Sequence, residues 1–188
     1  MLKYVLVTNE NLQFATNIQS RIFPKESAFL HYKYSIESNL EYIKYYLVYD
    51  NDNVVGITGL YSNEEISETN SIWLGWFGVL EDFRSNGYGK QIFLDTIDMA
   101  NDLKNKYPIK YFRLYTSERD DAIALSLYNK VMDIKEYYNN PDDDNYDGTC
   151  LIFSKSLTDQ PVPYWNNKFI NLKGIISDQE KSMLEINN

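Results

Sequence analysis

The stretch 77–90 carries the residue pattern of a phosphate-binding loop. It begins apolar, turns polar at Glu81, passes Arg84, and reaches two glycines, Gly87 and Gly89, before an amphipathic segment. This order predicts a strand, a loop and then a helix. The first turn of such a helix presents unpaired backbone N–H groups and the positive end of the helix dipole. A phosphate binds there without many charged side chains, so the segment is the first candidate for a functional site.

Two common glycine-rich phosphate loops do not fit the sequence. A dinucleotide-binding loop needs a third glycine, and this chain has Ile92 at that position. A P-loop needs Ser or Thr after its Gly-Lys pair, whereas Gln91 follows Lys90 here. A glycine turn that binds no ligand stays an alternative, because a single Gly-x-Gly pair is a weak pattern by itself.

The loop Arg84-Ser-Asn-Gly87-Tyr-Gly89 closely resembles the acyl-CoA loop of the GNAT superfamily of N-acetyltransferases. The signature of that family is Arg or Gln, two residues, Gly, one residue, and Gly or Ala. Further along, Asp121-Ala-Ile-Ala124-Leu-Ser-Leu-Tyr128 resembles the second motif of the family, with Asp121 in place of the usual Asn. The resemblance extends in strand order from residue 1 to about residue 155.

The resemblance implies a mixed α/β (α+β) fold, with a mostly antiparallel central sheet of about seven strands flanked by helices. In the GNAT fold the fourth and fifth strands splay apart, and acetyl-CoA, the acyl donor, lies between them. The residues implied in acetyl-CoA binding are Phe77, Gly78, Val79, Arg84, Ser85, Asn86, Gly87, Tyr88, Gly89, Lys90, Thr116, Asp121, Ala124 and Tyr128.

The resemblance also implies catalytic roles for Phe77 and Tyr128. The N–H of Phe77 would polarise the thioester carbonyl, as an oxyanion hole does. The phenol of Tyr128 would act as the general acid that protonates the departing thiolate. Gly87 and Gly89 are expected because a Cβ would obstruct the approach of the backbone to the pyrophosphate.

The base that deprotonates the attacking amine stays open. Several family members place a glutamate on the fourth strand, and Trp73 stands at the matching position here. Direct transfer, with proximity providing most of the acceleration, is one alternative. A chain of water molecules to bulk solvent is another. The candidate side chains are His31, Glu37, Glu68, Glu81 and Asp82.

Composition predicts one globular domain. Of 188 residues, 44% are hydrophobic and 24% are charged. We expect an acetyltransferase domain over residues 1–156 and an extension over 157–188 packed on it or next to it. No apolar run approaches the roughly 20 residues that span a bilayer. With Cys150 as the single cysteine and no Cys/His cluster, we expect a cytoplasmic protein without a metal.

Charge restricts the expected partners. The chain carries 27 acidic and 18 basic residues, a formal net charge of −9. No basic stripe is visible, so nucleic acid is not an expected partner. A membrane is not expected either, because the chain lacks a long apolar run. The acidic balance favours cationic amines as substrates. Some of the 17 tyrosines, clustered at 42–49 and elsewhere, are candidates to line a pocket for such an amine.

Periodicity and turn residues predict the elements around the loop. The predicted strands cover residues 3–7, 45–50, 54–61, 71–80, 110–115, 134–138 and 149–154. The first predicted helix begins after a Thr8 cap and ends near Ile22. Further helices are predicted over residues 35–44, 87–106 and 122–131, and a short final helix near Ser177. Residues 62–70 and 117–121 are expected to be loops.

Two functions stay open. The first is transfer of an acetyl group from acetyl-CoA to a primary amine of a small molecule or peptide, by direct attack in a ternary complex. The second is a catalytically silent acyl-CoA-binding module with a sensing or interaction role. Trp73 in place of the strand glutamate suggests the second function, as does the extension 157–188, which is a candidate homodimer contact. No pattern in residues 24–44 or 139–148 names the acceptor.

Overall fold

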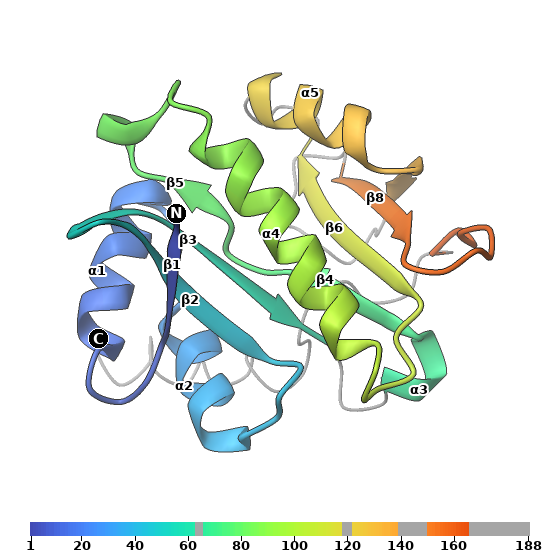
Figure 1. The fold of residues 1–188 in the computed structure, drawn as a ribbon, viewed down its shortest axis with the longest axis horizontal. Coiled ribbons are helices and arrows are strands. Elements are labelled where there is room, and N and C mark those ends of the chain that lie inside the picture. The colour runs from blue at the N-terminus through green and yellow to red at the C-terminus, as the bar shows by residue number, and fades with distance from the viewer. Residues whose placement is uncertain (63–65, 118–121, 139–149, 166–188) are drawn as a thin grey trace.

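The computed structural model describes residues 1–62, 66–117, 122–138 and 150–165 (Figure 1). Its helices are α1 (Leu12–Ile22), α2 (Phe29–Ser38), α3 (Ile66–Thr69), α4 (Tyr88–Leu103) and α5 (Ala122–Val131), with a 3-10 turn η1 (Glu81–Phe83). Its strands are β1 (Lys3–Leu6), β2 (Lys44–Asp50), β3 (Asn53–Tyr61), β4 (Ser71–Leu74), β5 (Gly78–Val79), β6 (Tyr111–Ser117), β7 (Ile134–Tyr138) and β8 (Cys150–Ser156). Among the described helices, none is long and apolar enough to cross a membrane.

The described strands form one mixed sheet. Their order is β1-β2-β3-β4-β6-β8-β7, and β5 pairs with β3 beside that path. Neighbouring strands run antiparallel, except that β4 and β6 are parallel. The structure therefore confirms the predicted mixed α/β fold with a mostly antiparallel sheet.

The sequence placed most elements correctly, and the exceptions have local causes. Asn11, and not Thr8, is the N-cap of α1, and its Oδ1 accepts a hydrogen bond from the Thr8 N–H at 2.8 Å. The helix expected at 35–44 is α2, which ends at Ser38 because Asn39 adopts a left-handed φ of 52°. The expected loop 62–70 contains α3. The expected final helix near Ser177 lies outside the described residues.

Helices cover both faces of the sheet. α4 crosses one face diagonally (Figure 1), and Thr96 on α4 lies 2.8 Å from Thr58 on β3, hydroxyl to hydroxyl. α2 covers the other face, where the rings of Tyr32 and Tyr45 have centroids 5.1 Å apart. Side chains alternate along a strand, so Gly59, the cross-strand partner of Tyr45, faces α2 while Thr58 faces α4.

A bulge separates β4 from β5. Leu60 pairs with Leu74 and Ile57 pairs with Gly78, so residues 75–77 lie opposite just two residues, 58–59. The extra residue bends the strand, as β-bulges do. Trp76, in the middle of the bulge, adopts a left-handed φ of 48°.

The bulge lets β5 and β6 diverge. β4 pairs with β6 as far as Trp73 and Arg113. Beyond that point β6 continues to Ser117 alongside β8, whereas β5 pairs with β3 and with no other strand among the described residues. Figure 1 shows β5 and β6 apart, on either side of α4. The splay implied for the fourth and fifth strands is thus present between β5 and β6.

Tyr45 fills a slot made by two glycines on the α2 face. Its side chain is 1% exposed. A Cβ on Gly59 would overlap the Tyr45 ring, and a Cβ on Gly75 would lie 2.9 Å from Tyr45 Cε1. The two glycines therefore set the depth at which the Tyr45 ring packs against the sheet.

We expect Gly59→Ala to destabilise the protein by about 1–3 kcal/mol, because the new methyl group must displace the buried Tyr45 ring. The free energy of unfolding in urea measures this loss. Gly89→Ala is the matched control, since a Cβ there meets nothing nearer than Val79 Cγ2 at 3.8 Å. Equal stability of both variants would contradict the proposed slot.

Candidate active site

A cavity of about 620 Å³ opens between the splayed strands and α2. Its walls come from the α1–α2 segment and α2, from β2, β3 and β4, from the bulge, and from β6 and α5. Its described lining residues are Phe23, Lys25, Glu26, His31, Tyr45, Tyr61, Leu74, Gly75, Trp76, Phe77, Leu114, Tyr115, Thr116, Ser117 and Tyr128.

The outer edge of β5 turns backbone groups toward the splay. The Leu80 N–H donates to the Val55 carbonyl oxygen of β3 at 3.0 Å. N–H groups alternate between the two sides of a strand, so that of Val79, within β5, points away from β3. Phe77 also lines the cavity. The role of its amide in polarising a thioester carbonyl stays a prediction.

The glycine loop ends at the N-terminus of α4. Gly87 is the N-cap, with a left-handed φ of 83°. The first helical bond runs from the Gln91 N–H to the Gly87 carbonyl oxygen at 3.1 Å. The N–H groups of Tyr88, Gly89 and Lys90 precede that bond, so they are the donors that a helix leaves for an anion.

Side chains of the loop stabilise its own backbone. Arg84 Nε donates to the Val79 carbonyl oxygen at 3.3 Å, and Asn86 Nδ2 donates to the carbonyl oxygens of Phe83 and Arg84 at 3.2 and 3.1 Å. The Tyr88 hydroxyl donates to Asp50 at 2.6 Å. Ser85 is exposed and left-handed, with a φ of 65°. These contacts hold the loop in an open turn ahead of α4.

The left-handed φ gives Gly87 a reason of its own, beside the predicted approach of the backbone to a pyrophosphate. No heavy atom lies within 4 Å of a Cβ built at Gly87, and a Cβ at Gly89 has room as well. The backbone conformation of Gly87, which L side chains rarely adopt, favours glycine there within the protein itself.

The second motif contributes Tyr128 to the cavity. The phenol is 7% exposed, and its ring packs on Phe93 and Phe153, with centroids 5.3 and 5.6 Å away. Thr116 on β6 is buried and lines the same cavity, whereas Ala124 is half-buried on α5 and outside the lining. Asp121 lies outside the described residues.

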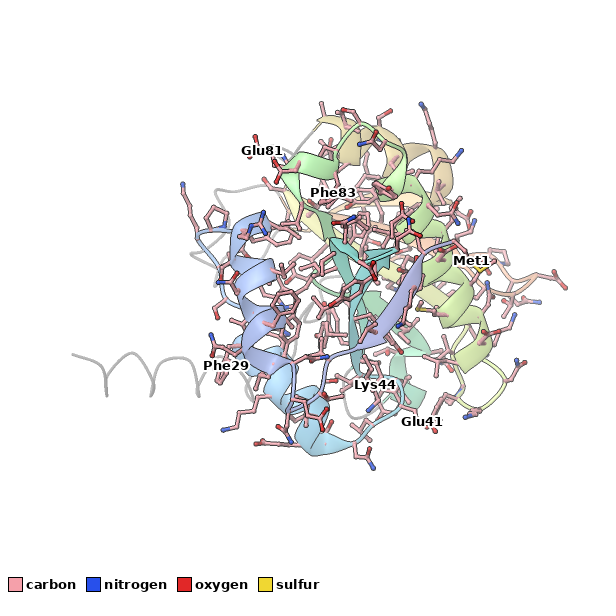
Figure 2. All side chains as sticks on the ribbon, turned by 60° about the vertical axis from the view of Figure 1, so that its left-hand side comes forward. Met1, Phe29, Glu41, Lys44, Glu81 and Phe83 are labelled. Atoms are coloured by element: carbon pink, nitrogen blue, oxygen red, sulfur yellow. The ribbon has the colours of Figure 1, made fainter. Side chains whose placement is uncertain are left out.

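One of the predicted candidates for the base reaches the cavity. His31 lines it, and its ring Nδ1 lies 3.3 Å from the Tyr45 hydroxyl. Glu37 is exposed and pairs with Lys33 at 3.7 Å, and Asp82 pairs with Arg21 at 3.6 Å. Figure 2 shows Glu81 pointing outward at one end of the molecule. The side chain of Glu68 is outside what the structure describes.

Burial controls the charge of His31. Its ring packs edge-on against Trp76, with centroids 5.6 Å apart, and against Tyr45. This environment lowers the pKa of His31 from 6.5 to about 4, because burial disfavours the imidazolium ion. His31 is therefore neutral at physiological pH.

Sequence reasoning missed most of the cavity wall. Tyr45 lay within a noted tyrosine cluster, but nothing in the sequence joined it to Tyr61, Tyr115 or Glu26. Trp73, at the expected base position, is 3% exposed and lies behind the wall, whereas Trp76 lines it. Among the described residues, no group of three or more His, Cys, Asp or Glu could hold a metal ion.

Known proteins resemble the chain in sequence family and in fold. The family model for the acetyltransferase (GNAT) family matches residues 12–133. No curated protein matches the sequence. The ribosomal-protein-S18-alanine N-acetyltransferase of Escherichia coli is 15% identical, covers 90% of this chain and all of its own, and superposes with a TM-score of 0.61.

Two further solved structures share the fold. Spermidine/spermine N-acetyltransferase SpeG of Vibrio cholerae is 14% identical over 83% of this chain and 92% of its own, with a TM-score of 0.62. A Bacillus subtilis acetyltransferase in complex with CoA is 18% identical over 84% of this chain and 98% of its own, with a TM-score of 0.54. At these identities the likeness carries the fold alone.

We predict that His31 titrates near pH 4. It is the single histidine of the chain, so one imidazole signal in a proton NMR titration reports its pKa. Because the folded-state pKa lies below the unfolded 6.5, the unfolded state binds more protons between pH 4 and 6.5, and acidification through that window destabilises the protein.

The same shift predicts a stability difference between variants. Lowering the pH from 7.5 to 5 should cost wild type about 2 kcal/mol more than it costs His31→Gln, measured by urea unfolding. An imidazole that titrates at pH 6–7, or an equal loss in both proteins, would contradict the burial argument.

Proposed function

Because the chain belongs to the acetyltransferase (GNAT) family, we propose that it transfers an acetyl group from acetyl-CoA to a primary amine of a small molecule or peptide, by direct attack in a ternary complex. The cavity between β5 and β6 carries the proposal. Its described lining brings Phe77 and Tyr128 together with His31 of α2. We propose that donor and acceptor meet in this cavity, at the bulge.

The phosphate loop fits the pyrophosphate of acetyl-CoA. The N–H groups of Tyr88, Gly89 and Lys90 and the dipole of α4 favour a negative charge at this helix end. Arg84 and Lys90 are exposed and add positive charge at the same place. We also propose that acetyl-CoA contacts the remaining predicted residues, which are Gly78, Val79, Ser85, Asn86, Thr116, Asp121 and Ala124.

Phe77 and Tyr128 would act on the reacting thioester. The Phe77 N–H would hydrogen-bond the carbonyl oxygen as negative charge develops there, and a preorganised backbone donor needs no reorganisation for this role. Tyr128 would protonate the departing sulfur. The Tyr128 ring packs against Phe93 of α4, and its side chain lines the cavity between β5 and β6.

The walls of the cavity favour the neutral form of the amine. His31 is a weak base, since a pKa of about 4 lies roughly six units below that of an alkyl ammonium ion. Burial against aromatic rings instead lowers the pKa of the ammonium ion itself, so we propose that the amine loses its proton to water at the cavity mouth.

The charges of the described lining favour an acceptor with one ammonium group. Lys25 and Glu26 carry the charged groups, and both are exposed at the mouth. A polyamine would bring several positive charges to a wall made mainly of aromatic rings, and unpaired charges are costly to bury. An amine attached to an apolar or aromatic group would fill the cavity without that cost.

The proposal also covers the domain bounds and the cellular location. We assign residues 1–156 to the acetyltransferase domain, and we assign 157–188 to an extension associated with it. Within the described part of that extension, Leu157 and Trp165 are buried, at 7% and 3% exposed. We propose a cytoplasmic location, which is compatible with the single, buried cysteine Cys150.

An amine panel with thiol detection tests the proposed function. We expect free CoA thiol from acetyl-CoA with L-phenylalaninamide, at a kcat/KM at least about tenfold above that with spermidine, because the latter carries unpaired charges. A peptide beginning with alanine completes the panel. Spermidine as the best substrate would contradict the acceptor class. Binding of acetyl-CoA without thiol release from any amine would favour the silent acyl-CoA-binding module.

Tyr128→Phe removes the proposed acid. We expect kcat to fall about 100-fold, the size of a general-acid contribution, while the Kd of acetyl-CoA stays within about twofold. Tyr137→Phe, on the exposed edge of β7, is the control for loss of a tyrosine hydroxyl. Unchanged turnover in Tyr128→Phe would remove Tyr128 from the mechanism.

Gly87→Ala tests the phosphate loop. A left-handed conformation costs an L residue about 1–2 kcal/mol, so the loop would relax and the Kd of CoA would rise about tenfold. Isothermal titration calorimetry with CoA measures the change. Gln91→Ala, an exposed position one turn into α4, is the control. Wild-type affinity in Gly87→Ala would place the pyrophosphate elsewhere.

A further inference from the structure

A second layer of side chains lies behind the aromatic wall of the cavity. Tyr61, Trp73 and Tyr115 face the same side of the sheet, because Tyr61 pairs with Trp73, and Trp73 pairs with Arg113, two residues before Tyr115. Tyr61 and Tyr115 line the cavity, whereas Trp73 does not. Trp73 contacts both of them. Its ring stacks on Tyr61 at 6.4 Å and 23°, and meets Tyr115 edge-on at 6.4 Å and 63°.

The back of Trp73 is covered by Trp165. The two indole rings lie 4.9 Å apart at 80°, and Trp165 is 3% exposed. Trp165 comes from the segment that follows β8, so the extension 157–188 reaches the sheet face on which the cavity opens. The Trp165 ring therefore covers a part of Trp73 that Tyr61 and Tyr115 do not cover.

Arg113 holds the Trp165 segment in place. Its side chain is 1% exposed, and its Nη2 donates to the Pro163 carbonyl oxygen at 3.1 Å. The guanidinium lies over the Trp165 ring, 5.1 Å from its centroid, and over Tyr111 at 5.4 Å. Its Nε and Nη1 donate to the hydroxyls of Ser71 and Ser154 at 3.0 and 2.6 Å. Burial lowers the pKa of Arg113 to about 10.

Glu136 fixes the backbone of Trp165 from the neighbouring strand. The Trp165 N–H donates to both carboxylate oxygens of Glu136, at 3.0 and 2.8 Å. Glu136 also contributes negative charge near Arg113. Charge-assisted hydrogen bonds of this kind are stronger than neutral ones, so the ring of Trp165 has a fixed position and angle.

We propose that Trp165 is a positioning residue of the acceptor site, which holds the wall formed by Tyr61 and Tyr115 through Trp73. The inference rests on the proposed function, in that the cavity takes the amine. It makes the extension part of the transferase site. Loss of the ring would leave a space behind Trp73, and Trp73 would move into that space and away from Tyr61 and Tyr115.

Trp165→Ala, Trp165→Phe and Tyr164→Ala test the proposal in the full chain. Tyr164 is 61% exposed, so its truncation is a matched control for the same segment. With L-phenylalaninamide, we expect Trp165→Ala to raise the KM about tenfold, with kcat changed less than threefold and the Kd of acetyl-CoA changed less than twofold. Trp165→Phe should restore most of the KM, and Tyr164→Ala should match wild type.

Hydrogen exchange gives a readout that needs no acceptor. With CoA bound, we expect amides of residues 57–61 and 113–117 to exchange about tenfold faster in Trp165→Ala, while those of α4 keep the wild-type rate. If wild type releases no thiol with any amine, the proposed function fails, and the exchange rates still decide whether Trp165 holds the wall. Unchanged rates in both strands, equal acceleration throughout the protein, or an unchanged KM in Trp165→Ala would overturn the proposal.

Discussion

The candidate site depends on one extra residue in the strand that becomes β4 and β5. Three residues, 75–77, lie opposite two residues of β3, so the strand after the bulge cannot stay beside β6. The bulge also changes which side each residue faces. In a regular strand, residues three apart face opposite sides. Here Trp73 contacts Tyr61, Trp76 contacts His31, and both lie on the α2 face. The left-handed φ of Trp76 is a strained conformation that the surrounding Phe23 and His31 rings hold.

Local patterns predicted the parts of the site that depend on neighbours in sequence. The loop 84–90 could be recognised because its glycines, its arginine and the helix behind it are consecutive. The hairpin of β2 and β3 and the helix α5 follow from short polar links and helical spacing in the same way. The family and its fold were predicted because two such local motifs occur in the right strand order. Figure 2 places Glu41 and Lys44 toward the opposite end of the molecule from Glu81 and Phe83.

The cavity wall could not be predicted in this way, because its residues are brought together by strand register. Tyr45, Tyr61 and Tyr115 are separated by 16 and 54 positions in sequence and become neighbours through the pairings of β2, β3, β4 and β6. A shift of one residue in any pairing would turn a wall tyrosine to the α4 face. The bulge is such a shift, and the two glycines beside it, Gly75 and Gly78, do not give the change of register in the sequence. The side chain of Trp73, the residue that the sequence matches to the base position, lies behind the wall.

Charge acts differently at the surface and inside the cavity. The net charge of −9 produces an attractive field for a cationic amine in solution, and such a field raises the rate of encounter. The described lining, by contrast, is mostly aromatic, and His31 is held neutral by burial. In the proposed mechanism an ammonium ion would gain from this field on approach and lose hydration on entry, which would lower its pKa. The cationic form would arrive, and the neutral nucleophile would be the form that the lining penalises least. Such a site would work without a strand glutamate, because desolvation would shift the amine towards its neutral form.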